Sequence, residues 1–135
     1  MDQFTNVPDR GKINREDAHA SDRNFIIAKK GNDYLVVKLE AIACFYTKEK
    51  LVFAVDKEGK KMMVDDTALA QLEERLDPET YFRINRQVIV SIHYIRRFRI
   101  FQRQRIEIEL DVVVPFALVA SQSGSIGFRK WIYAH

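Results

Sequence analysis

Short apolar segments separated by polar turns of three or four residues recur after residue 24, and this spacing limits the possible folds. "NFIIAKK" and "YLVVKL" flank "GND", "AIACFYT" and "LVFAVD" flank "KEK", and "KEGK" leads into "KMMVD". Paired apolar segments around short polar turns are typical of β-hairpins. The chain lacks a strand–helix–strand alternation, which argues against a doubly wound parallel sheet.

Further strands are expected at "QVIVS", "RRFRIF" and "RIEIELD", the last two around the turn "QRQ". In "RIEIELD", Ile106, Ile108 and Leu110 alternate with charged residues and predict one buried face. "VVVPFALVA" is expected as an apolar strand in which Pro115 favours an edge or a bulge.

The spacing of apolar residues changes in "DDTALAQLEERLDPE" to one typical of a helix. Leu69, Leu72 and Leu76, at i, i+3 and i+7, share one helical face. Asp65 or Asp66 is the expected N-cap, and the helix should end before the proline at position 78. A short closing helix is expected in "SGSIGFRKWIYAH", although its two glycines disfavour helix. Its expected packing residues are Ile126, Phe128 and Trp131. The predicted fold class is mainly β, with short strands and one or two short helices.

Residues 1–23 are polar, with no apolar periodicity, and are interpreted as a disordered tail or interdomain linker. Residues 24–135 then form one domain, a length that allows a hydrophobic core. No apolar run has the roughly 20 residues of a membrane span, and the N-terminus lacks the apolar region of a signal peptide. The single cysteine, Cys44, lies in an apolar run and is expected to be buried. These features predict a cytoplasmic protein.

The sequence offers no constellation for catalysis. The three histidines, at positions 19, 93 and 135, are scattered and lack the spacing of metal ligands. Walker, G-x-G-x-x-G and G-x-S-x-G motifs are absent. Glu107, Glu109 and Asp111 share a strand face, but alternation with apolar residues is what a half-buried strand needs. We therefore expect no enzymatic activity and no cofactor.

Residues 81–106 contain seven arginines and no Asp or Glu, whereas the rest of the domain mixes both signs. One interpretation is a set of solvent-facing strand positions, with Glu107 or Glu109 as partners of Arg99 and Arg105. The other is a surface for phosphate, because the guanidinium fork donates two parallel hydrogen bonds to an anion. The same fork also recognises guanine in a major groove.

Polar side chains are concentrated where apolar strands end. Asn85, Arg86 and Gln87 follow Ile84 and precede the apolar run that starts at Val88, so the strands should present them outward on a short loop. Further polar loop donors are expected in two other places: Lys48, Lys50, Ser121, Gln122 and Ser123.

The stretch "LDPETYFRINRQVIVSIHYI" resembles the signature of the LytTR DNA-binding domain, in which paired aromatics precede Arg, Ile or Val, a polar pair and an apolar run. "LEAIACFYTKEK", "TALAQLEERLD" and "LVASQSGSIGFRKWI" resemble the family's charged loop, helix and closing Ser-Arg motif. The resemblance covers about residues 24–133. It implies an elongated, multi-sheet β fold whose loops enter successive major grooves of double-stranded promoter DNA.

The resemblance also implies partners. Family members are usually output domains of bacterial two-component response regulators, which act with a sensor histidine kinase. An N-terminal receiver domain places two such domains on direct repeats, as a homodimer on DNA. No membrane contact is implied for this domain.

The family's DNA contacts carry over to three places in this chain. They are the loop with Lys48 and Lys50, the central loop with Arg83 before it, and the closing pair Ser121-Gln122, where Gln replaces the usual Arg. Ser91 stands where the family often has Asn. The implied DNA-binding residues are Lys48, Lys50, Arg83, Asn85, Arg86, Gln87, Ser121 and Gln122.

Two other functions remain open from the residues alone. An RNA- or single-strand-binding β domain would need exposed aromatics for base stacking, and Tyr46, Phe98 and Phe101 are the candidates. A protein-interaction module would use the basic strip to bind an acidic partner.

Overall fold

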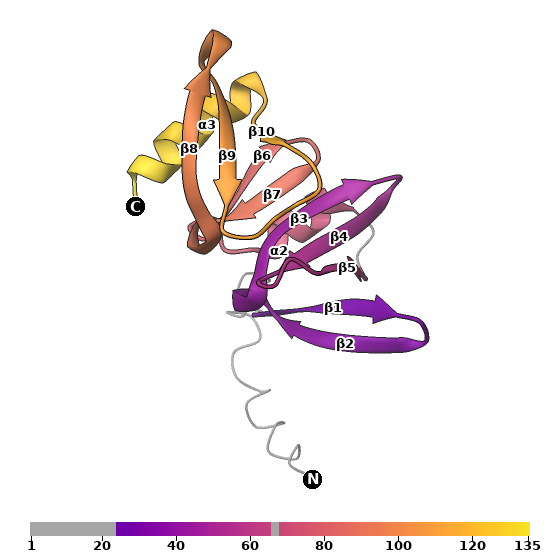
Figure 1. Cartoon of the computed structure of the whole chain (residues 1–135). Coiled ribbons are helices and arrows are strands. Elements are labelled where there is room, and N and C mark those ends of the chain that lie inside the picture. Colours follow the sequence, from indigo (N-terminus) through magenta and orange to yellow (C-terminus); the bar gives the residue numbers. More distant parts are fainter. Residues whose placement is uncertain (1–23, 66–67) are drawn as a thin grey trace.

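The computed structural model describes residues 24–65 and 68–135, so the expected tail at 1–23 lies outside the described residues. Within the described part, the strands form a seven-stranded and a three-stranded sheet, and all their pairings are antiparallel (Figure 1). The larger sheet has the order β2-β1-β5-β4-β3-β7-β6 and the smaller one β10-β9-β8. The fold is therefore mainly β, as predicted.

Strands β1 to β5 of the larger sheet follow the expected hairpins, and β7 lies at the expected strand "QVIVS". Their bounds are β1 Phe25–Lys30, β2 Asp33–Lys38, β3 Ile42–Lys48, β4 Leu51–Asp56, β5 Lys61–Val64, β6 Tyr81–Asn85 and β7 Val88–Ser91. In the smaller sheet, β8 (Ile95–Phe101) pairs with β9 (Arg105–Leu110), which pairs with β10 (Leu118–Val119). Short 3-10 turns join some of them: Leu39–Ala41, Ile92–Tyr94 and Gln102–Gln104.

Two hydrophobic cores lie on opposite faces of the larger sheet. The first packs Phe45 and Ile89 of the sheet against the short helix α2 (Leu69–Arg75). The second packs the sheet against β9 and the closing helix α3 (Gln122–Tyr133). Ile106, Ile108 and Leu110 are all buried in the second core, which confirms the face predicted from their alternation.

The N-terminal end of α2 differs from the prediction. Leu69, Leu72 and Leu76 are buried as expected, but the helix starts at Leu69 with Ala68 in the cap position and no side-chain cap bond. Asp65 precedes this start by four residues, and Asp66 lies outside the described residues. A helix of seven residues without a polar cap depends on its buried leucines rather than on its own propensity.

The closing helix α3 forms, and its two glycines have a packing role. A Cβ at Gly124 would lie 2.1 Å from the carbonyl oxygen of Ile84, so only glycine allows this approach of α3 to β6. Phe128 is fully buried and Trp131 is half-buried, as expected. The prediction for Ile126 was wrong, because two residues correspond to about 200° around a helix and place it opposite Phe128. Its side chain is 61% exposed.

The expected strand "VVVPFALVA" is mostly irregular. Only Leu118 and Val119 pair with β9, and Pro115 lies in the connection before them. Proline lacks the N–H that a ladder needs, which fits its place outside the strand. The short β10 is an edge of the smaller sheet, the position expected for this segment.

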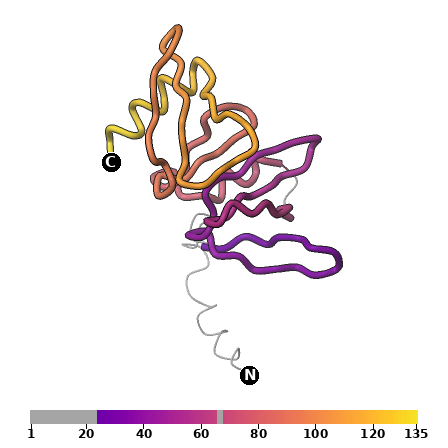
Figure 2. The backbone as a smooth tube through the Cα atoms, in the orientation of Figure 1, coloured from indigo at the N-terminus to yellow at the C-terminus, as the bar shows by residue number. Residues whose placement is uncertain are grey.

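The molecule is extended rather than round. The β1–β2 hairpin lies at one end, and the β8–β9 hairpin with α3 lies at the other (Figures 1 and 2). In the part of the chain that the structure describes, no helix is long and apolar enough to span a bilayer.

Candidate nucleic-acid interface

The β6–β7 turn, Arg86-Gln87, is held by the side chain of Asn85. Its Oδ1 accepts a hydrogen bond from the backbone N–H of Gln87 at 2.7 Å. Its Nδ2 donates to the carbonyl of Val119 in β10 at 2.8 Å. Both ends of the amide are engaged, so Asn85 positions the turn, and the side chains of Arg86 and Gln87 remain exposed.

Arg83 supports the same turn from behind. Its guanidinium donates to the carbonyls of Asn85 at 3.2 Å and Arg86 at 2.6 Å, and pairs with Glu73 of α2 at 3.0 Å. The Arg83 side chain is only 26% exposed. The structure therefore gives Arg83 a bracing role in which its charge is offset by a carboxylate, unlike the exposed Arg86 beside it.

Ser121 joins the closing motif to the central one. Its backbone N–H donates to the carbonyl of Ile84 at 3.0 Å, and its Oγ accepts from Gly124 N–H at 3.0 Å as the N-cap of α3. Gln122 follows as the first helical residue and is exposed. Because Ile84 directly precedes Asn85, these bonds fix Gln122 relative to the Arg86-Gln87 turn.

Arg105 completes this part of the surface, and it is not among the residues predicted for the site. It starts β9 and donates to the carbonyl of Ala120 through Nε at 3.4 Å and Nη2 at 3.2 Å. A shallow hollow of about 590 Å³ is lined by Asn85, Arg86, Gln87, Arg105, Val119 and Ser121. No local pattern singles out Arg105, since its place depends on the pairing of β9 with residues 118–120.

The β3–β4 hairpin carries Lys48 and Lys50 beside the Arg86-Gln87 turn. The N–H of Thr47 donates to the carbonyl of Gln87 at 3.0 Å, which continues the pairing of β3 with β7. One further step of this register places Lys48 opposite Arg86. Lys50 lies at the hairpin tip, so this hairpin adds two exposed cations next to the hollow.

The tip of this hairpin has a strained backbone. Glu49 (φ 53°) and Lys50 (φ 69°) both adopt the left-handed conformation that normally favours glycine or asparagine. Strain of this kind is often retained where a side chain is needed for function.

Lys50→Gly should therefore raise the free energy of unfolding by about 0.5–1 kcal/mol, because glycine adopts a positive φ without steric cost. The same change should weaken DNA binding, because it removes a cation. Chemical denaturation and duplex titration measure the two effects. Lys57→Gly, at an exposed position without a positive φ, is the control and should not stabilise the fold. Destabilisation by Lys50→Gly would contradict the strain argument.

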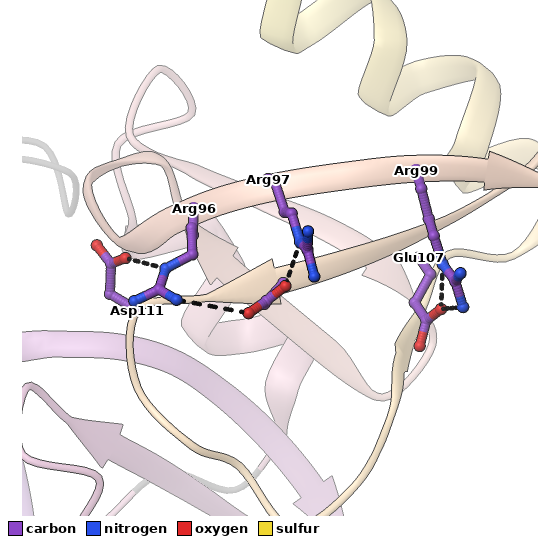
Figure 3. A network of polar contacts seen from close by, with 6 residues as sticks. Arg96, Arg97, Arg99, Glu107 and Asp111 are labelled. Atoms are coloured by element: carbon purple, nitrogen blue, oxygen red, sulfur yellow. Dashed lines mark hydrogen bonds and ion pairs between the residues drawn. The ribbon is translucent and has the colours of Figure 1, made fainter.

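The arginines of β8 are paired with two acids of β9 and with Asp111, which directly follows β9 (Figure 3). Arg99 pairs with Glu107 at 2.7 Å, Arg97 with Glu109, and Arg96 with Asp111 at 3.2 Å. Three of the seven arginines in the acid-free segment 81–106 thus have their counter-charges on β9 or directly after it. The Arg99–Glu107 pair was among the expected cross-strand partners, and the phosphate interpretation now applies least to these three residues.

The described residues contain no cluster of metal ligands. No group of three or more His, Cys, Asp or Glu residues among them could hold a metal ion. Cys44 is fully buried, and this burial raises the pKa of its thiol to about 12, so it is uncharged at neutral pH. Its predicted role as a small buried residue is confirmed.

Comparisons with known proteins point to one family. The model of the LytTr DNA-binding domain matches residues 32–132 of the chain. No curated protein gives a significant match. Among solved structures, the chain is similar to the LytTr DNA-binding domain of a Bacillus cereus protein described as a methyl-accepting/DNA response regulator. The identity is 18%, the TM-score is 0.71, and the match covers 82% of this chain and 97% of that one.

Proposed function

The chain belongs to the LytTR DNA-binding domain family, and on this premise we propose that it is a sequence-specific regulator of transcription that binds double-stranded DNA. This is a family of DNA-binding domains rather than of enzymes. We assign the binding domain to residues 24–135.

One observation carries the assignment of the contact surface. Arg86 is exposed on a two-residue turn whose backbone is fixed by Asn85, Arg83 and Thr47. No hydrogen bond or ion pair engages its side chain within residues 24–65 and 68–135. An arginine that is held rigidly and left unpaired suits bidentate contact with a guanine edge or a phosphate.

The neighbouring side chains extend this contact. Lys48, Lys50 and Arg105 add positive charge around Arg86, and Gln87 and Gln122 add neutral donors and acceptors. Gln122 stands where the family usually has Arg. It can pair with adenine N6 and N7, but it adds no charge. Asn85, Arg83 and Ser121 take part by holding the backbone of these segments, as their hydrogen bonds support.

We further propose that the protein is arranged on DNA as members of this family usually are. The loops enter successive major grooves, and two copies bind as a homodimer at direct repeats. A receiver domain preceding this chain, phosphorylated by a sensor histidine kinase, would control that arrangement in a two-component system. The protein would act in the bacterial cytoplasm.

Binding should depend strongly on salt, because each neutralised phosphate contributes about 0.9 to the slope of log K against log salt. Arg105→Gln should reduce this slope by about that amount if Arg105 contacts phosphate. Arg97→Gln is the matched control, since Arg97 is already paired with Glu109 and should leave the slope unchanged. Titrating a duplex selected from random sequences at several salt concentrations tests both. Absence of salt-sensitive binding to any duplex would refute the function.

The single-strand alternative has lost most of its support. Tyr46 is only 6% exposed, and Phe98 packs edge-on against Phe128 at 5.2 Å. Phe101, 40% exposed near the β8–β9 turn, is the one candidate stacking residue of the three that is still accessible. A preference for single strands over duplex in direct competition would revive this alternative.

A further inference from the structure

Strand β2 is the outer edge of the seven-stranded sheet and has unused backbone groups. The N–H of Leu39 donates to the carbonyl of Asn24, so Leu39 and Asn24 are a hydrogen-bonded pair next to the β1–β2 ladder. This pair shows which residues of β2 bond to β1. Bonded pairs alternate in an antiparallel ladder, so Asp33, Leu35 and Val37 face β1. The N–H and C=O groups of Tyr34, Val36 and Lys38 point away from the sheet, have no backbone partner within residues 24–65 and 68–135, and can pair with another strand.

The side chains of β2 are unusually apolar for an edge. Tyr34 is 59% exposed, Leu35 42% and Val36 67%. Edge strands normally carry proline, a bulge or a central charge, which discourage pairing with other chains. β2 has no proline, its register with β1 is continuous, and its charges, Asp33 and Lys38, lie only at the two ends. The strand therefore has the features of a pairing surface.

We propose that β2 pairs antiparallel with β2 of a second copy of this chain, about a two-fold axis at Val36. In this register Val36 lies opposite its own counterpart, and Tyr34 lies opposite Lys38 of the second copy. The contact resembles one within the chain, where Lys29 lies over the Tyr34 ring at 5.7 Å. Asp33 also comes within one residue of the second copy's Lys38. A parallel pairing would instead place like charges together, which is unfavourable.

This β2–β2 contact is separate from the proposed DNA binding. It has two-fold symmetry, whereas copies bound to a direct repeat do not. Neighbouring copies on a direct repeat share one orientation, so a two-fold axis cannot relate them. The β2 contact would therefore join copies that occupy separate repeats or separate duplexes. It leaves the β6–β7 turn with Arg86 free, since β2 and β6 are opposite edges of the seven-stranded sheet (Figure 1).

Sedimentation of the full chain without DNA, up to about 1 mM, the weak end of specific association, tests the proposal. The wild type should shift from monomer to dimer with concentration. Val36→Lys and Val36→Asp should each remain monomeric, because like charges meet on the axis. An equimolar mixture of the two variants should dimerise again, because opposite charges then meet. Val113→Lys, at an apolar residue 87% exposed elsewhere, is the control and should dimerise as the wild type does.

Amide hydrogen exchange on the wild type tests the same contact without any substitution. Exchange at Tyr34, Val36 and Lys38 should slow as concentration rises, while Leu35 and Val37, already bonded to β1, should change little. A wild type that stays monomeric throughout, or a variant mixture that fails to associate, overturns the proposal. Since no DNA is present, neither result bears on the proposed DNA-binding function.

Discussion

Arg86→Ala is expected to weaken binding to a specific duplex by about 1–3 kcal/mol, roughly 5- to 150-fold in Kd, and to relax base preference at one position. The turn that carries Arg86 is fixed by bonds from other residues, so alanine removes the contact without disturbing the backbone. Stability should change little, because the side chain is exposed.

Two further variants show whether that loss of affinity reflects a base contact, a phosphate contact or the removal of any exposed arginine. Arg97→Ala removes an arginine that is similarly exposed but paired with Glu109, and its effect on affinity should be small. Arg86→Lys keeps the charge but loses the planar fork, so it should retain much of a phosphate contact and little of a base contact. Competition between duplexes that differ at single positions measures both. Equal losses for Arg86→Ala and Arg97→Ala would contradict the assigned surface.

Gly124→Ala should destabilise the fold by about 1–3 kcal/mol or more, although alanine is the better helix former by about 1 kcal/mol. The added methyl would lie 2.1 Å from the Ile84 carbonyl oxygen and 2.8 Å from Ser121 Oγ. Relief requires α3 to move away from β6, which would break the Ser121–Ile84 bond and displace Gln122. DNA binding should fall together with stability.

Gly127→Ala is the matched control on the same helix. Its methyl would lie 3.1 Å from Cζ of Phe82, a side-chain atom that can shift by a few tenths of an ångström. The gain in helix propensity should then offset the contact to within about 1 kcal/mol. Chemical denaturation of both variants provides the comparison. Similar stabilities for the two variants would show that the approach of α3 to Ile84 is not the constraint.

The hairpins and buried faces were predictable because both follow from local periodicity. Each expected turn from Gly31 to Gln104 lies between strands, and Ile106, Ile108 and Leu110 are buried together. The predicted polar cap of α2 failed because tertiary contacts override a local rule. Asp65 or Asp66 was predicted to cap α2, but the buried leucines stabilise this helix without a side-chain cap. The glycines of α3 lower its propensity but allow it to pack against β6.

The candidate site was predictable only as a set of loops. Sequence spacing places polar residues at strand ends, but it does not show which of their side chains form hydrogen bonds within the protein. Arg83, Asn85 and Ser121 have side chains engaged in hydrogen bonds that shape the surface, whereas the Arg86 side chain has none within the described residues. Arg105 was missed, and the carboxylates facing the β8 arginines lie eight to fifteen residues away in sequence. Such contacts depend on strand pairing, which no single segment encodes.

The contact of Gly124 with Ile84 has a consequence for how target sites can diverge among related regulators. It joins backbone to backbone, so exchanging the side chains at positions 86 and 122, the proposed base contacts, would change which bases are preferred without moving one loop relative to the other. Relatives that keep glycine at this position are therefore expected to differ in which bases they prefer. The number of base pairs that separates the base contacted by the first loop from the base contacted by the second should stay the same.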